Sequence, residues 1–233
     1  MRQVVLDTET TGLEVNKGHR IVEIGCVELI ERRPTGREFH RYLNPERAID
    51  EGARAVSGIS DEFLVDKPLF AEVAVELLSF IEGAELIMHN AAFDVGFLDA
   101  ELARLDLRVR VVERATVLDT LALAREKYPG QKNSLDALCK RLNIDNSHRE
   151  LHGALLDAQL LADVYLAMTA GQGDLGLGAV GGDSAQRRVR AAQTVRPILR
   201  VRHADAAEIA AHHLRLQTIV AASHGKCRWP DAS

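Results

Sequence analysis

The chain has 233 residues, of which 46% are hydrophobic and 27% charged, and no apolar run approaches the ~20 residues of a membrane span, so we expect a cytoplasmic globular protein of one or two domains. Its three cysteines, Cys26, Cys139 and Cys227, are far apart and odd in number, which excludes a disulfide framework and a zinc-binding spacing. The net charge of −5 is unevenly spread: residues 184–233 carry nine basic and three acidic side chains, a net +6, which leaves −11 for residues 1–183 and makes that part a poor binder of polyanions without metal ions and a partner.

Three strands are predicted near the start of the chain. Residues 2–6 (RQVVL) form a short run rich in β-branched residues, which is typical of a buried strand. Residues 20–30 (RIVEIGCVELI) predict a second strand, residues 31–36 (ERRPTG) a turn, and residues 37–43 (REFHRYL) a third strand. We therefore expect a hairpin or meander.

Helices and strands alternate after this hairpin. Apolar residues at helical spacing, together with proline, glycine and serine at the ends, predict the following elements: a helix between Asp66 and Gly83, a strand at 85–89, a helix at 91–105, a strand and a helix between 109 and 127, a helix from Ser134 to Leu142, and a helix at 154–168. This order predicts an α/β fold with a mixed sheet and helices on both of its faces.

The composition changes after residue 170. Six of the twelve residues at 171–182 are glycine, which indicates a flexible linker. Beyond it, residues 196–202 (RPILRVR) predict a strand or extended segment, and residues 204–220 predict a helix capped by Asp205. We therefore divide the chain into three parts: a first domain at 1–170, a linker at 171–186 and a C-terminal segment at 187–233.

The segment DTETTG at residues 7–12 places two acids at the end of the first strand. Strand side chains alternate, so Asp7 and Glu9 point to the same face. Two carboxylates this close repel each other unless a cation lies between them, and oxygen ligands favour Mg²⁺ or Mn²⁺ over zinc. A solvated strand end explains this pair equally well when the pair is taken alone.

A third acid, Asp94, lies in the segment HNAAFDVGF at residues 89–97. It occupies the first turn of a predicted helix, and its helical neighbours Phe97 and Leu98 are apolar, so its carboxylate borders a buried stripe. Taken alone, Asp94 is explained more simply as an acid that the helix dipole stabilises.

The fourth acid lies in LHGALLDAQLLADVYL at residues 151–166. Asp157 shares a helix stripe with Leu161 and Val164, and a charge on a buried face costs free energy unless it is paired or binds a metal. His152 precedes the helix by two residues. A lone histidine is more often a surface or capping residue than a base, but its position near these acids favours a functional role.

Four carboxylates and one histidine are the side chains that two-metal hydrolysis of a phosphodiester requires. Two ions ~3.5–4 Å apart stabilise the leaving oxygen and hold the attacking water. A histidine with a pKa of ~6.5 accepts the proton of that water near neutral pH. The sequence therefore predicts a metal-dependent nuclease.

Taken together, DTETTG, HNAAFDVGF and HGALLDAQLLADVYL resemble the three exonuclease motifs of the DEDD superfamily, histidine subclass, and more closely those of the proofreading epsilon subunits of bacterial DNA polymerase III, along residues 2–172. The resemblance implies a ribonuclease H-like fold with a five-stranded mixed sheet, and 3′→5′ removal of deoxynucleotides from a single-stranded or frayed DNA end. It implies that two divalent ions are held by Asp7, Glu9, Asp94 and Asp157, and that His152 is the general base.

The resemblance also implies which side chains contact the substrate, namely Asp7, Glu9, Thr10 and Asp157. In well-known family members a glutamate and a histidine approach the terminal nucleotide from the segment that here reads DEGARAVSGI, where this chain has Gly52 and Ser57. We therefore expect altered substrate affinity, with at most one hydrogen bond from Ser57.

Partners follow from the same resemblance. The basic C-terminal segment beyond the linker is expected to bind the alpha subunit of the polymerase. The peptide QGDLGL is similar to a sliding-clamp motif, with Gln172 as a polar anchor and Leu175 and Leu177 as apolar contacts. A small accessory subunit is a further expected partner, and no membrane is.

Three other functions compete with this interpretation. An RNA-trimming 3′ exonuclease would use the same catalytic residues, but it has no need of a linker and docking helix. A non-catalytic architectural subunit would not need all five catalytic side chains. A dinucleotide-binding enzyme is excluded, because no glycine-rich phosphate loop follows the first strand.

Overall fold

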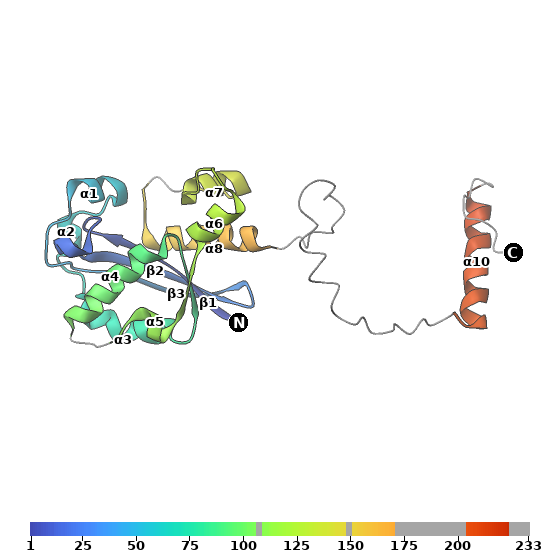
Figure 1. Ribbon diagram of the computed structural model, residues 1–233, viewed down its shortest axis with the longest axis horizontal. Coiled ribbons are helices and arrows are strands. Elements are labelled where there is room, and N and C mark those ends of the chain that lie inside the picture. Colours follow the sequence, from blue (N-terminus) through green and yellow to red (C-terminus); the bar gives the residue numbers. More distant parts are fainter. Residues whose placement is uncertain (106–108, 148–150, 171–203, 224–233) are drawn as a thin grey trace, which may run out of the picture. The chain divides into compact units, whose positions relative to one another are not determined.

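The computed structural model describes residues 1–105, 109–147, 151–170 and 204–223 (Figure 1). The described residues fall into two units: those up to residue 170 belong to an α/β domain, and those from 204 on form a separate helix, α10 (Ala206–Ala222). The predicted linker, the clamp-like peptide with Gln172, Leu175 and Leu177, and the predicted extended segment at 196–202 lie outside the described residues.

The α/β domain is built on one five-stranded mixed sheet with the order β3-β2-β1-β4-β5. Strand β1 pairs antiparallel with β2 and parallel with β4, and β4 pairs parallel with β5. The predicted mixed sheet is therefore confirmed. The strands are β1 (Arg2–Thr10), β2 (Ile21–Ile30), β3 (Arg33–Tyr42), β4 (Glu85–Met88) and β5 (Thr116–Asp119).

Helices cover both faces of this sheet, as the sequence predicts. Alternating residues of β1 point to opposite faces, so Val4 and Leu6 pack with α3 and α4, whereas Val5 packs with α8. The helical elements are η1 (Val15–Lys17), α1 (Glu51–Ser57), α2 (Asp61–Leu64), α3 (Phe70–Ile81), α4 (Ala91–Arg104), α5 (Val111–Arg114), α6 (Thr120–Lys127), α7 (Leu135–Leu142) and α8 (Ala154–Thr169).

The hairpin between β2 and β3 is tighter than expected. Its turn consists of Glu31 and Arg32, which both have positive φ angles, and β3 begins at Arg33. Pro34 lies within β3, which is possible because β3 is an edge strand and needs no donor on its outer side. The prediction of a six-residue turn at 31–36 is therefore wrong.

Helix α8 approaches the sheet very closely at its first turn. A Cβ atom on Gly25 of β2 would lie 2.2 Å from the backbone nitrogen of Leu155, so only glycine allows this approach. Gly25 is paired with Asp7 of β1, and directly opposite residues share a face of the sheet. The beginning of α8 is thereby held over the acidic end of β1.

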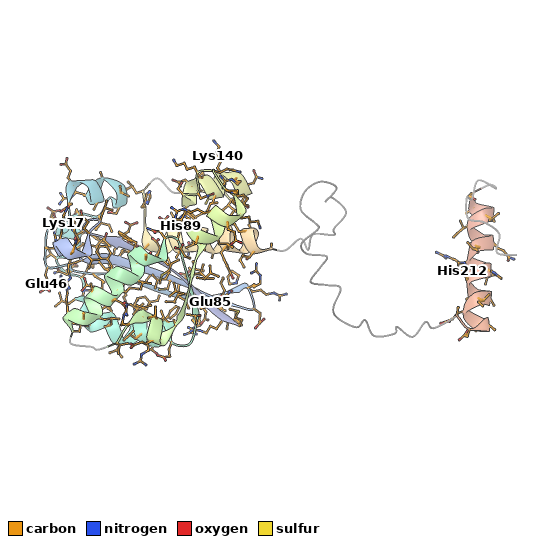
Figure 2. All side chains as sticks on the ribbon, in the orientation of Figure 1. Lys17, Glu46, Glu85, His89, Lys140 and His212 are labelled. Carbon is orange, nitrogen blue, oxygen red and sulfur yellow. The ribbon has the colours of Figure 1, made fainter. Side chains whose placement is uncertain are left out.

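Helix α10 begins as predicted, with Asp205 as its cap. Asp205 and Glu208 form a capping box. The Asp205 carboxylate accepts a hydrogen bond from the Glu208 backbone nitrogen at 2.9 Å, and the Glu208 carboxylate accepts one from the Asp205 backbone nitrogen at 3.0 Å. Its side chains project around the whole helix (Figure 2), and none is buried. Across the described residues, no helix combines the length and the apolar character that crossing a membrane requires.

Candidate active site

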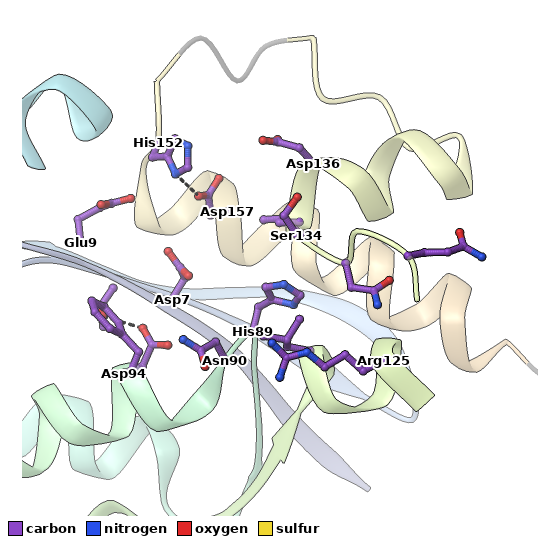
Figure 3. A pocket seen from close by; sticks show the side chains of 16 residues that line it. Asp7, Glu9, His89, Asn90, Asp94, Arg125, Ser134, Asp136, His152 and Asp157 are labelled. Carbon is purple, nitrogen blue, oxygen red and sulfur yellow. Dashed lines mark hydrogen bonds and ion pairs between the residues drawn. The ribbon is translucent and has the colours of Figure 1, made fainter. Parts of the chain in front are cut away.

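One pocket of about 560 Å³ brings together all five residues that the sequence predicts as catalytic (Figure 3). It lies at the carboxyl ends of β1 and β4, where the parallel part of the sheet gives way to helices. The five are Asp7 and Glu9 of β1, Asp94 of α4, His152 just before α8, and Asp157 in the first turn of α8.

Asp7 and Glu9 reach the pocket through the period-two alternation of β1, which turns both side chains to the face covered by α8. On β2, the residue opposite Asp7 is Gly25, and the residue opposite Glu9 is Glu23. The first pairing leaves room for α8, and the second brings another carboxylate under the pocket. Both acids thus lie where a helix and a neighbouring strand converge.

Asp94 comes from the other face of the sheet and is only 2% exposed. Thr8 donates a hydrogen bond to its Oδ1 atom at 2.7 Å. Burial raises the pKa of Asp94 from 3.8 to about 7, although the hydrogen bond from Thr8 opposes this rise. A cation in the pocket would remove this cost by stabilising the charged form.

His152 and Asp157 are positioned by the start of α8. The backbone nitrogen of His152 donates to the carbonyl of Val56, the penultimate residue of α1, at 3.1 Å. Its Nδ1 atom lies 3.5 Å from Oδ2 of Asp157, which is 4% exposed. Helix α1 was not predicted, and it holds the segment before α8 in place.

A metal-binding geometry is present on this side of the pocket. One ligand atom each of Glu9, His152 and Asp157 lies within 4.8 Å of the other two. With Asp7 and Asp94 lining the same pocket, most of these donors are carboxylate oxygens, which suit hard divalent cations. The residues therefore fit the predicted metal site, while the individual catalytic roles stay predictions.

Thr10 and Ser57, the other predicted substrate contacts, do not line the pocket and are both buried. The Thr10 hydroxyl donates to the carbonyl of Gly12 at 2.8 Å. The Ser57 hydroxyl donates to the carbonyl of Ala53 at 3.0 Å and accepts from the backbone of Ile59 at 3.3 Å. A contact from either side chain to substrate stays a prediction.

Glu23, which is 2% exposed on β2, is a residue of the site region that was not predicted from the sequence. Its Oε1 atom lies 2.7 Å from Nε2 of His40, and its carboxylate would lie 3.9 Å from a Cβ atom built on Gly153. Glu23 therefore lies beneath the start of α8 and beside Glu9. Alternation along β2 was the signal that would have placed it there, because Glu23 and Gly25 share a face.

Comparison with known proteins fits this geometry. Residues 4–165 match the family RNase_T, described as exonuclease. The chain belongs to this exonuclease family. It is 52% identical over 239 residues to the DNA polymerase III subunit epsilon of Escherichia coli K12, covering 98% of this chain and 97% of that one. It is 58% identical over 178 residues to the subunit epsilon of Haemophilus influenzae, covering 75% of this chain and 70% of that one.

Solved structures of exonucleases share the fold. Exonuclease X in complex with 5′-overhanging duplex DNA has a TM-score of 0.57 and 26% identity, and the match covers 73% of this chain and 93% of that one. The nuclease domain of 3′hExo, a DEDDh family member bound to rAMP, has a TM-score of 0.61 and 19% identity over 72% of this chain and 90% of that one. The predicted membership of the exonucleases and of the epsilon subunit family is confirmed. Exonucleases of this type use divalent metal ions.

Proposed function

We propose that this exonuclease is the proofreading subunit of a bacterial replicative DNA polymerase III, which removes mispaired deoxynucleotides from the primer 3′ end. The main support is that four carboxylates and a histidine meet in one pocket. This pocket occurs in a chain that matches the epsilon subunits along 98% of its length. The pocket alone would support nuclease activity, and the match along the whole chain supports the more specific role in proofreading.

In this proposal Asp7, Glu9, Asp94 and Asp157 hold two divalent ions, Mg²⁺ or Mn²⁺. When bound, such ions neutralise the acids and the phosphate and make the attacking water more acidic. His152 accepts the proton of that water at its ring. The carboxylate of Asp157, 3.5 Å from Nδ1 of His152, stabilises the charged ring that results.

Selection of mispaired ends must come from the delivery of the strand, because the proposed metal site does not contact base edges. Unpairing a terminal nucleotide costs a few kcal/mol, and least when it is mispaired. The polymerase would grip the duplex, which the acidic first part of the chain is poorly suited to do. A tether to the polymerase would also raise the local concentration of the nuclease at the primer end.

The C-terminal segment at 187–233 would provide this tether by binding the alpha subunit. Helix α10 supports this role, since it exposes four large apolar side chains, Ile209, Leu214, Ile219 and Val220. The linker at 171–186 would carry the clamp contact through Gln172, Leu175 and Leu177, and a small accessory subunit would be a further partner. The protein would then work in the cytoplasm as part of the replisome.

The test is hydrolysis of labelled primer ends by the full-length protein in Mg²⁺. We expect fast removal from single strands and mispaired ends, and slow removal from paired ends. Equal rates on paired and mispaired ends would contradict proofreading. Faster hydrolysis of RNA than of DNA of the same sequence would favour the RNA-trimming alternative, and an Asp7→Ala variant as active as the wild type would place the activity elsewhere.

A further inference from the structure

The pocket continues beyond the acids into a second half that the proposed chemistry does not use. We call this half the polar shelf: His89 and Asn90 at the end of β4, Arg125 of α6, and Asn133 and Ser134 before α7. Figure 3 shows Arg125 on the far side of His89 from the acids Asp7 and Asp94. Among the described residues that line the pocket, Arg125 is the only lysine or arginine.

Hydrogen bonds hold the walls of the polar shelf in place. Asn133 is 7% exposed, its Oδ1 atom accepts from Arg141 at 3.0 Å, and its Nδ2 donates to the carbonyl of Tyr128 at 3.3 Å. The Arg141 guanidinium also lies 4.6 Å from the centre of the Tyr128 ring. The loop between α6 and α7 is thus tied to α7, which favours a preformed wall.

Helix α6, which carries Arg125, is fixed to β4 at its start. The Asp119 carboxylate accepts hydrogen bonds from the backbone nitrogens of Leu121 at 2.8 Å and of Asn90 at 3.1 Å. Thr120 bonds the Met88 carbonyl at 3.0 Å and lies 2.9 Å from Nδ1 of His89. The position of Arg125 relative to the acids therefore depends on ordered backbone rather than on a long free loop.

The charge of Arg125 is available to a ligand. Its side chain is exposed, and no carboxylate in the described part of the chain forms an ion pair with it. Its neighbour His89 has a lowered pKa, because burial, and to a lesser degree the charge of Arg125, disfavours the charged ring. The polar shelf thus presents one cation among polar groups, and the carboxylate of Asp136 lines the pocket beside Ser134.

The chemistry of a 3′ end decides which phosphate this cation meets. The terminal nucleotide contributes a single phosphate, the one that is cleaved, and ends in a hydroxyl. Any second phosphate in the pocket therefore belongs to the strand on the 5′ side of the cleaved bond. We propose that Arg125 binds the first phosphate 5′ of the scissile one, so that the strand enters the active site over the polar shelf.

This inference rests on the proposed nuclease function, and it makes Arg125 a residue that binds the substrate strand without taking part in bond cleavage. Arginine suits the role, because its planar guanidinium pairs with two phosphate oxygens at once. An acidic domain needs such a contact to keep a polyanion from leaving between successive cuts. Loss of the contact should weaken binding and leave the chemical step unchanged.

The experiment compares two thymidine substrates. TpT contains only the scissile phosphate, and TpTpT adds the phosphate assigned to Arg125. In the full-length protein, Arg125→Gln should raise KM for TpTpT about ten-fold, the loss expected for one charge-assisted contact, with kcat and the KM for TpT unchanged. The salt dependence of log kcat/KM for TpTpT should become shallower by about 0.7.

Two variants serve as controls. Arg125→Lys keeps the positive charge but loses the planar guanidinium that pairs with two phosphate oxygens. Its KM for TpTpT should therefore lie between those of the wild type and Arg125→Gln. Arg114→Gln removes the same charge from an exposed site outside this pocket, where Arg114 pairs with Glu82, and it should behave as the wild type. Equal effects of Arg125→Gln on TpT and TpTpT, or no effect on either, would overturn the inference. A wild-type protein that cleaves neither substrate would instead refute the proposed function, and the inference with it.

Discussion

Asp94 allows a direct physical test of the site. Because its carboxylate is buried, ionising it should lower the free energy of unfolding of the metal-free protein. Replacing it by asparagine keeps the shape and keeps an oxygen that accepts from Thr8, which lies 2.7 Å from Oδ1 of Asp94. The replacement removes the ionisable group. The difference between the two proteins therefore isolates the cost of the buried carboxylate.

The size and sign of this cost follow from the pKa. In the unfolded chain the carboxyl ionises near 3.8, and in the folded protein burial raises its pKa to about 7. Between these pH values the folded state holds a proton that the unfolded state has lost, so stability falls as the pH rises through this interval and no further above it. At roughly 1.4 kcal/mol per pH unit, the loss at pH 8 is at most about 4 kcal/mol.

The assay is urea unfolding in EDTA at pH 5 and pH 8. We expect Asp94→Asn to gain stability relative to the wild type between these pH values. Asp66→Asn, a change at an exposed carboxylate outside the pocket, should show no such gain. Mg²⁺ at pH 8 should stabilise the wild type more than Asp94→Asn. A difference between wild type and Asp94→Asn that is the same at both pH values would refute the reasoning.

Three further changes test other parts of the account. Gly25→Ala should destabilise the protein by about 3 kcal/mol in thermal unfolding, because its Cβ would lie 2.2 Å from the backbone of Leu155; a wild-type melting temperature would show that α8 does not approach so closely. Asp205→Ala should lower the helicity of a peptide spanning 203–223, measured by circular dichroism, since it removes a cap of about 1 kcal/mol; unchanged helicity would argue against the capping box. His152→Ala should lower kcat about 10²- to 10⁴-fold while Mn²⁺ affinity is kept, and a large loss of Mn²⁺ affinity would make His152 a metal ligand instead of a base.

The sequence was sufficient to predict most of the longer helices and strands, and to predict the five proposed catalytic residues, which all line one pocket. Asp7 and Glu9 follow from strand alternation, and Asp157 from an acid on an apolar helix stripe. Each signal has an ordinary explanation when it stands alone. They point to one site because the carboxyl ends of neighbouring parallel strands meet at one edge of a sheet, and the first turn of α8 lies over the end of β1 at that edge.

The elements that were not predicted are those whose formation depends on contacts between residues far apart in the sequence. Helices α1 and α2 have seven and four residues, too few to show an apolar period. The turn at Glu31 and Arg32 uses two positive φ angles without the glycine or asparagine that normally indicates them. Its shape is imposed by pairing of the long strands on both sides, which no short window of sequence contains.

Contacts around the site were equally hidden. Glu23 lies in a run that reads as one buried strand, and its partner His40 comes from the next strand. The position of Arg125 beside His89 depends on hydrogen bonds that tie the start of α6 to the end of β4, two segments about thirty residues apart in the sequence. Such groups can be assigned only once the strands and helices are in place, because nothing in their spacing marks them.

The central claim, that these four acids jointly hold divalent cations, is tested most directly by counting Mn²⁺ ions bound by the wild-type protein and by Asp7→Ala and Asp157→Ala in the presence of a single-stranded oligonucleotide. The account predicts about two ions per wild-type chain, with loss of binding in both variants and no hydrolysis where binding is lost. Wild-type hydrolysis that persists in EDTA, or variants that bind Mn²⁺ as the wild type does, would contradict it.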